Sequence, residues 1–127
     1  MIVGATARGR ITDRRMSTND TIFIRPDAAE WRDLGGGVRR LVMGHDDRIM
    51  MVKVEFAAGA EGAPHCHPHS QSSLIERGRF CVTIGGVAET LEAGDGFFVP
   101  SGVEHGVVAL EAGTIVDVFA PAREDFL

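Results

Sequence analysis

The segment APHCHPHSQSS (residues 63–73) carries three histidines at alternate positions and a glutamine two places after the third. Side chains two residues apart project from the same face of a β-strand, so His65, His67 and His69 would share one side. Gln71 continues the same phase. Taken singly, each histidine is also explained as a buried core residue, but two imidazoles at this spacing can hold one metal ion. The segment therefore predicts a strand that carries a metal site.

Short apolar runs of β-type composition surround this segment. Strands are expected at residues 21–25, 38–44, 48–57, 72–78, 79–85, 97–100, 105–110 and 114–120. Turn signals rich in glycine and acidic residues separate them, at residues 35–37, 45–47, 59–64, 85–86, 93–96 and 111–113. The only helix-like pattern is the short stretch PDAAEW (26–31). This spacing predicts an all-β protein, either an antiparallel sandwich or a barrel.

The size and charge of the chain limit its function. Its 127 residues fit one domain that can fold without a metal or a disulfide, so a metal would serve chemistry. The net charge of -5, from 13 basic and 18 acidic residues, is unfavourable for contact with a phosphate backbone. We therefore expect no nucleic-acid partner.

The lengths of the apolar runs bear on where in the cell the protein is located. The start of the chain has no apolar run of signal-peptide length, and no segment reaches the roughly 20 apolar residues that span a bilayer. We expect a cytoplasmic protein with no membrane partner. In that reducing compartment Cys66 and Cys81 would be free thiols, and Cys81 would be buried in the core beside Phe80 and Val82.

The chain divides into two parts. Residues 1–20 are polar and carry arginines without periodicity, which predicts a flexible arm or an edge strand exchanged with a neighbouring subunit. Residues 21–127 are expected to form the single domain. The runs at 50–56 and 114–119 are apolar on both faces, as expected when one face packs on a second sheet or on another subunit. We therefore expect a homodimer.

Beyond the opening segment, His45 and His105 are the remaining histidines that could complete a metal site. The wider pattern resembles the cupin superfamily, whose first motif is glycine, five residues, His-x-His, three or four residues, Glu or Gln, six residues, glycine. The matching residues are His65, His67, Gln71 and Gly78, with the leading glycine shifted to Gly59 or Gly62.

The second cupin motif is also present. It is met by Gly94, Pro100, Gly102 and His105, with Ala109 in place of the final asparagine. The resemblance covers residues 35–120 and implies a jelly-roll β-barrel that holds one divalent ion in its mouth. The implied metal ligands are His65, His67, Gln71 and His105. Such donors suit nickel, zinc, iron, manganese and copper alike.

Gln71 stands where many cupins place a glutamate. Three imidazoles and one amide leave both charges of the ion uncompensated, which favours polarising a carbonyl or hydroxyl oxygen over activating dioxygen. His69 lies one pleat further along and is expected beside the site rather than among the ligands. Cys66 is expected to pack on the outer face.

The segment TIVDVFAPARED (114–125) carries a second set of candidates. Ile115, Asp117 and Phe119 share one face of the predicted strand, so Asp117 is a carboxylate among hydrophobic residues. Burial of a carboxylate is costly unless it is paired or functional. One explanation is an ion pair with Arg123 or Arg77. The other is a general acid or base, with Phe119 as an apolar wall and Arg123 as a fork for a substrate carboxylate.

Within the cupins, the chain is similar to the KdgF-type pectin-degradation proteins, most specifically in DVFAPAREDFL (117–127). This resemblance implies conversion of 4,5-unsaturated uronates, released from pectin or alginate, into the linear 4-deoxy-5-keto-uronate. The implied catalytic residues are Asp117, Phe119 and Arg123. A small acidic sugar would be the substrate, and its carboxylate and hydroxyls suit an arginine and a metal ion.

Two alternatives belong to other classes. One is a different metal-dependent cupin enzyme, a small-acid isomerase or a dioxygenase, which bound iron and oxygen uptake would reveal. The other is a non-catalytic cupin that binds a sugar or another ligand. The fold alone does not separate them.

Overall fold

The computed structural model describes residues 22–127 as one antiparallel β-network with two short 3-10 helices, η1 (Pro26–Ala28) and η2 (Glu124–Phe126). The strands are β1 (Arg32–Gly35), β2 (Val38–His45), β3 (Met50–Phe56), β4 (Glu61–His65), β5 (Ser70–Ile84), β6 (Val87–Glu92), β7 (Gly96–Val99) and β8 (His105–Ala120). The all-β prediction is confirmed. Among the described helices, none has the length and hydropathy of a membrane span. The expected N-terminal arm, residues 1–20, lies outside the described residues.

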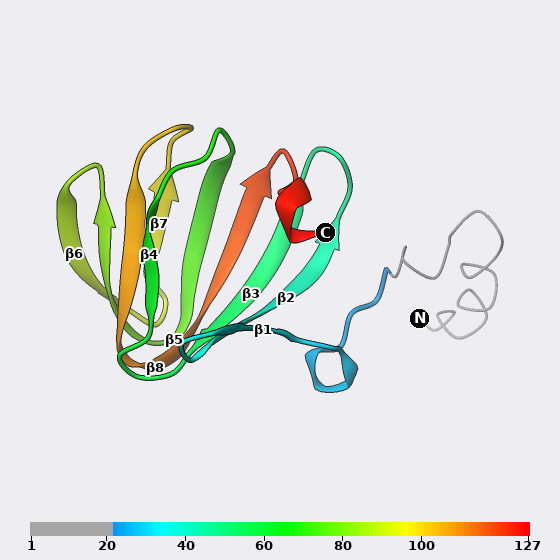
Figure 1. Ribbon diagram of the computed structural model, residues 1–127, viewed down its shortest axis with the longest axis horizontal. Helices are drawn as coiled ribbons and strands as arrows, with labels where there is room; N and C mark the ends of the chain where they lie inside the picture. Colours follow the sequence, from blue (N-terminus) through cyan, green and yellow to red (C-terminus); the bar gives the residue numbers. More distant parts are fainter. Residues whose placement is uncertain (1–21) are drawn as a thin grey trace, which may run out of the picture.

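Two long strands, β5 and β8, organise the barrel. They pair along their whole length, with Ser70 opposite Ala120 at one end and Ile84 opposite His105 at the other. One half of the pair continues through β3, β2 and β1 on the β8 side and through β7 on the β5 side. The other half carries β4 beside β8 and β6 beside β5. Figure 1 shows both long strands curving from one half to the other at the bottom of the view.

The bend depends on two glycines that lie against each other. A Cβ on Gly113 would overlap the carbonyl oxygen of Arg77, and a Cβ on Gly78 would meet the carbonyl of Ala112. Only glycine permits this approach of two backbones. The register between β5 and β8 shifts at the same place, between Ile75 and Phe80. The predicted strands 72–78 and 79–85 are therefore one bent strand, β5, and the strands predicted at 105–110 and 114–120, with a turn at 111–113, are one bent strand, β8.

Other local predictions differ from the structure. Residues 22–25 form no strand, and PDAAEW yields only the one-turn helix η1. Strands β1 and β6 and the first part of β4 were not expected, because their residues are mostly exposed and lack an apolar alternation. Strand β4 also contains Gly62 and Pro64, which favoured a turn. These short strands lie at sheet edges: among the described residues, β1 pairs only with β2, β4 only with β8 and β6 only with β5.

The core lies between the two halves of the bent sheet. One cluster is built around Phe56 and Phe80, whose rings meet edge to face with centroids 5.2 Å apart. A second cluster, at the other end of the interior, contains Met50, Val52 and Phe119. Cys81 is only half-buried, because Phe80 and Val82 take the inward positions on either side of it. Its expected place in the core is thus corrected.

Candidate metal centre

Three histidines from different elements meet at one end of the barrel. His65 ends β4, His67 lies in the connection to β5, and His105 begins β8 opposite His65. Residues 63–73 are thus not one continuous strand, since β4 ends at His65 and β5 begins at Ser70. The ligand atoms of the three histidine rings nevertheless lie within 4.8 Å of one another. His45 is exposed at the end of β2 and does not belong to this group.

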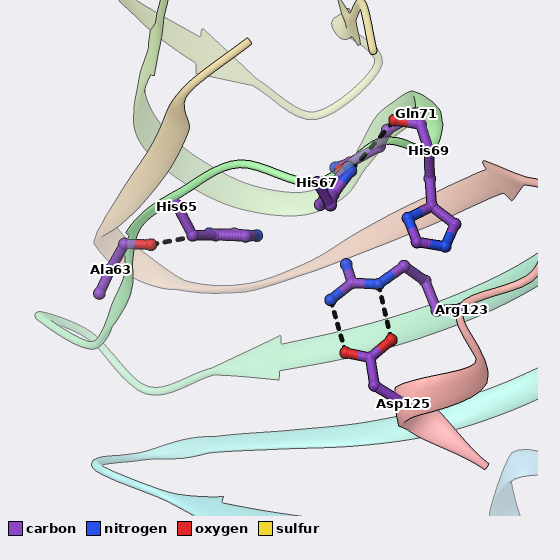
Figure 2. Close-up of polar contacts among 7 residues, drawn as sticks. All are labelled: Ala63, His65, His67, His69, Gln71, Arg123 and Asp125. Atoms are coloured by element: carbon purple, nitrogen blue, oxygen red, sulfur yellow. Dashed lines mark hydrogen bonds and ion pairs between the residues drawn. The ribbon is translucent and has the colours of Figure 1, made fainter. Parts of the chain in front are cut away.

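The hydrogen bonds of the three rings set their tautomers. Each Nδ1 lies 2.9–3.0 Å from a backbone carbonyl oxygen: Ala63 for His65, seen in Figure 2, His69 for His67, and Val103 for His105. A carbonyl only accepts, so each Nδ1 donates its proton and each Nε2 is left with a lone pair. This is the tautomer that binds a metal through Nε2.

Burial strengthens this assignment. It lowers the pKa of His67 and of His105, with the nearby charge of Arg123 adding to the effect at His67, so both imidazoles favour the neutral form. Nε2 of His105 is buried and has no hydrogen-bond partner within residues 22–127. Because an unpaired buried nitrogen is costly, the donor set fits a divalent cation at this position.

Gln71, on the inner face of β5, completes the predicted ligand set. Its Oε1 lies 3.0 Å from Nε2 of His67, while its Nε2 donates to Ser73 Oγ at 3.0 Å and to Asp117 Oδ1 at 3.2 Å. The carboxylate thus orients the amide so that its oxygen faces His67 (Figure 2). Two lone pairs then face each other, an arrangement that a shared cation stabilises. All four predicted ligands are brought together.

Asp117 lies on the interior face of β8, on the same side as Ile115 and Phe119, as predicted. It is half-buried, because its side chain borders a cavity. Ser73 Oγ donates a short hydrogen bond of 2.6 Å to Oδ1. Burial raises the pKa of Asp117 to about 6, and the hydrogen bonds from Ser73 and Gln71 partly oppose that rise.

The alternative of an ion pair at Asp117 is not found among the described residues. Arg77 contacts Thr114 instead, at 3.4 Å, and Arg123 binds Asp125 through Nε and Nη2 at 3.0 and 2.8 Å, as drawn in Figure 2. The guanidinium of Arg123 also lies 5.2 Å from the ring centroid of Phe119. Asp117 therefore accepts hydrogen bonds from the neutral side chains of Ser73 and Gln71 and forms no ion pair with Arg77 or Arg123.

Phe119, His69 and Cys66 complete the surroundings. Phe119 is buried and packs edge to face on His67, with ring centroids 5.7 Å apart. His69 contacts the ligand His67 through its carbonyl, and its ring turns toward Arg123 (Figure 2), which agrees with its expected place beside the site. Cys66 is exposed rather than packed, so that prediction was wrong.

A cavity of about 250 Å³ connects these groups. Its wall includes His65, Gln71 and His105 together with Asp117, Phe119 and Arg123, and apolar side chains such as Val38, Val54 and Ile115. Sites for drug-sized ligands occupy roughly 300–1,000 Å³, so this one suits a small molecule. The wall also contains Arg40 and Phe126, and Ser73 lies just behind it. Sequence reasoning missed these three residues.

Comparison with known proteins places the chain. A family model described as the cupin domain matches residues 52–119. The pectin degradation protein KdgF of Dickeya dadantii (strain 3937) is 42% identical over 103 residues, which cover 80% of this chain and 94% of that protein.

Two solved structures agree with this placement. An RmlC-like cupin from Shewanella frigidimarina NCIMB 400 superposes with a TM-score of 0.82 at 45% identity, over 84% of this chain and 96% of its own. KdgF from Halomonas sp. superposes with a TM-score of 0.81 at 36% identity, over 84% of this chain and 99% of its own. The chain therefore belongs to the cupin superfamily and, within it, to the family of the pectin-degradation protein KdgF.

Proposed function

We propose that the protein opens the ring of 4,5-unsaturated uronates from pectin or alginate breakdown, giving the linear 4-deoxy-5-keto-uronate. One observation carries the proposal: a carboxyl with a raised pKa, Asp117, is hydrogen-bonded to the metal-ligand candidate Gln71 in the same small cavity. A proton-transfer group and a site for an oxygen-polarising ion thus face one bound molecule.

The reaction is an isomerisation and needs no oxidant. The proton of the hydroxyl at C1 leaves, the bond from C1 to the ring oxygen breaks, and the enol released at C5 becomes a ketone when C4 takes a proton. A divalent ion held by His65, His67, Gln71 and His105 would supply Lewis-acid polarisation of a substrate oxygen. Asp117 accepts the hydroxyl proton and returns a proton to C4. With a pKa of about 6, both of its protonation states are accessible near neutral pH.

The remaining residues position the substrate. Phe119 offers an apolar wall beside His67. Arg123, held by Asp125 on its Nε edge, has donors on Nη1 that can bind the substrate carboxylate. Ser73 and Gln71 hold Asp117 in place.

The test uses the product of a pectate or alginate lyase that has acted to completion. Metal-loaded protein should accelerate the loss of the ring double-bond absorbance over buffer, without oxygen uptake. Asp117→Asn should abolish the acceleration and leave metal content unchanged, whereas Asp27→Asn, at an exposed position in η1, should behave as wild type. Oxygen consumption would favour a dioxygenase, and binding without turnover would favour a ligand-binding cupin.

We also propose a homodimer. Met51, Leu74 and Phe98 expose apolar side chains on the outer face of β3, β5 and β7, with exposed fractions of 43%, 46% and 57%. Exposed apolar side chains on one face of a sheet support association. Light scattering should give twice the chain mass, and Leu74→Glu should shift it to the monomer. A monomeric wild type would contradict the proposal.

We further propose a cytoplasmic location, where the free thiols of Cys66 and Cys81 stay reduced. Cell fractionation with an antibody against the protein would test it, and recovery in the extracytoplasmic fraction would contradict it.

A further inference from the structure

Two adjacent arginines on β2 have different environments. Arg39 is on the outer face, where its Nε binds Glu55 across the β2–β3 pair at 2.7 Å. Arg40 points to the interior, between the positions of Val38 and Val42, and contributes to the cavity that also contains the metal-ligand candidates. A half-buried arginine on the inner face of a small barrel is unusual, because the charge loses hydration there.

The charges around Arg40 do not compensate it. No carboxylate within residues 22–127 forms an ion pair with its guanidinium, which lies instead 3.8 Å from the ring centroid of Phe126. Arg32 is directly opposite on β1, and like charges in that position repel. Burial, followed by the charge of Arg32, lowers the pKa of Arg40; the charge of Asp125 partly opposes this effect, and that of Arg123 adds to it. Arg40 is therefore a partly desolvated cation without an ion-pair partner among the described residues.

Arg123 differs from Arg40 in this respect. It also lies over Phe126, at 4.3 Å from the ring centroid, but Asp125 binds it with two hydrogen bonds. The pair of Arg123 and Asp125 carries no net charge. Of the two guanidiniums on the cavity wall, Arg40 is thus the one whose positive charge is left for an anion.

We propose that Arg40 binds the carboxylate of the substrate and supplies the charge by which the enzyme selects an acidic sugar. This inference rests on the proposed uronate function and adds to it a binding residue outside the cupin motifs. Arg123, neutralised by Asp125, orients the same carboxylate by hydrogen bonding. Phe126 holds both guanidiniums at the cavity wall through cation–π contacts.

The experiment compares two substrates, the unsaturated uronate and its methyl ester, which replaces the charged carboxylate by a neutral ester group. Wild-type enzyme should have a higher kcat/KM for the acid. Arg40→Gln should raise KM for the acid by about tenfold to one hundredfold, the range for a lost charge-assisted hydrogen bond, and change kcat/KM for the ester less than threefold. Arg40→Lys should recover part of the preference for the acid.

The controls separate binding from folding. Arg39→Gln removes a charge from the next residue on the opposite face and should leave both substrates unaffected. Metal content and melting temperature are measured for every variant. Arg40→Met, which fits the apolar neighbours Val38 and Val42, replaces the glutamine variant if the latter does not fold. A purely structural role would lower activity on acid and ester by the same factor, and that result would overturn the proposal.

Failure of the proposed function has a different signature. If wild-type enzyme does not turn over the acid, the uronate function itself is wrong. If wild-type enzyme is active and Arg40→Gln keeps its preference for acid over ester, only the role of Arg40 is wrong. Calorimetry with galacturonate and galactose gives a readout without turnover: wild type should bind the acid more tightly, and Arg40→Gln should bind both alike.

Discussion

Removal of the Ser73 hydroxyl should change the pH dependence of the reaction. Ser73 Oγ donates a 2.6 Å hydrogen bond to Asp117, and this bond lowers the pKa of that carboxyl against the larger effect of burial. Ser73→Ala should therefore raise the pKa of Asp117. The side chain does not touch the substrate cavity, so an effect on activity would act through Asp117.

The size of the effect follows from the hydrogen bond. A hydrogen bond to a charged group contributes about 1.5–3 kcal/mol, which at about 1.4 kcal/mol per pKa unit equals about 1–2 units. The donor Gln71 remains, so we expect a shift of about one unit. From a starting pKa of about 6, the ionised fraction at pH 6.5 would fall from about three-quarters to about one-quarter, and at pH 8.5 would hardly change.

The assay is kcat/KM for the unsaturated uronate between pH 5 and pH 9. The acidic limb of the Ser73→Ala profile should move to higher pH, with about threefold lower activity at pH 6.5 and near wild-type activity at pH 8.5. Ser72→Ala is the matched control, because Ser72 is exposed on the outer face of the same strand. An acidic limb that stays in place, or equal losses at both pH values, would refute the reasoning.

Three further predictions concern stability and metal. Gly113→Ala should destabilise the fold by about 3 kcal/mol, since its Cβ would overlap a backbone carbonyl, whereas Gly86→Ala, with no atom within 4 Å, should cost about 1 kcal/mol for its positive φ alone; urea unfolding measures both. In metal-free protein, burial raises the folded-state pKa of Asp117 from 3.8 to about 6. The folded protein therefore holds this proton more tightly than the unfolded chain, and the free energy of unfolding falls as pH rises from about 4 to about 6. Asp117→Asn should therefore be more stable than wild type at pH 8 by up to about 3 kcal/mol, and equal near pH 3.5; lower stability at pH 8 would contradict the burial argument. Chelation should lower the melting temperature of wild type and leave that of His105→Ala unchanged, because the variant has lost a ligand; equal metal content in both proteins would exclude His105 from the site.

The fold class and the inward-facing residues of β8 could be predicted from the sequence, because both follow from the two-residue alternation of apolar side chains along a strand. In β8, the alternation of Ile115, Asp117 and Phe119 placed all three on the interior face. The metal ligands met although His65 and His67 do not share a strand, since β4 and β8 pair at His65 and His105. The histidines were expected to meet because alternate residues of one strand share a face. They meet instead because β4 pairs with β8.

Features set by tertiary packing could not be predicted. Gly113 was predicted in a turn and Gly78 at the end of a strand, yet their role is to let two continuous strands cross at a bend. The pairing of Arg123 with Asp125 depends on the short helix η2, which is too short to leave a periodic signal in the sequence.

Two site residues did have local signals. Ser73 continues the phase of Gln71 on β5, and Arg40 interrupts the inward apolar positions Val38 and Val42 on β2. Neither signal identifies a site residue by itself, because the sequence does not show that β2 and β5 border the same cavity.

The most direct test of the account is the fate of the proton at C4. The metal-loaded enzyme should be mixed with the unsaturated uronate in deuterium oxide and sampled by NMR during the first turnovers. If Asp117 delivers the proton from a fixed place in the cavity, the linear product should carry one deuterium at C4 in a single configuration, and Asp117→Asn should give only the slow, unselective buffer reaction. Rapid formation of both configurations by wild-type enzyme would contradict proton delivery by Asp117.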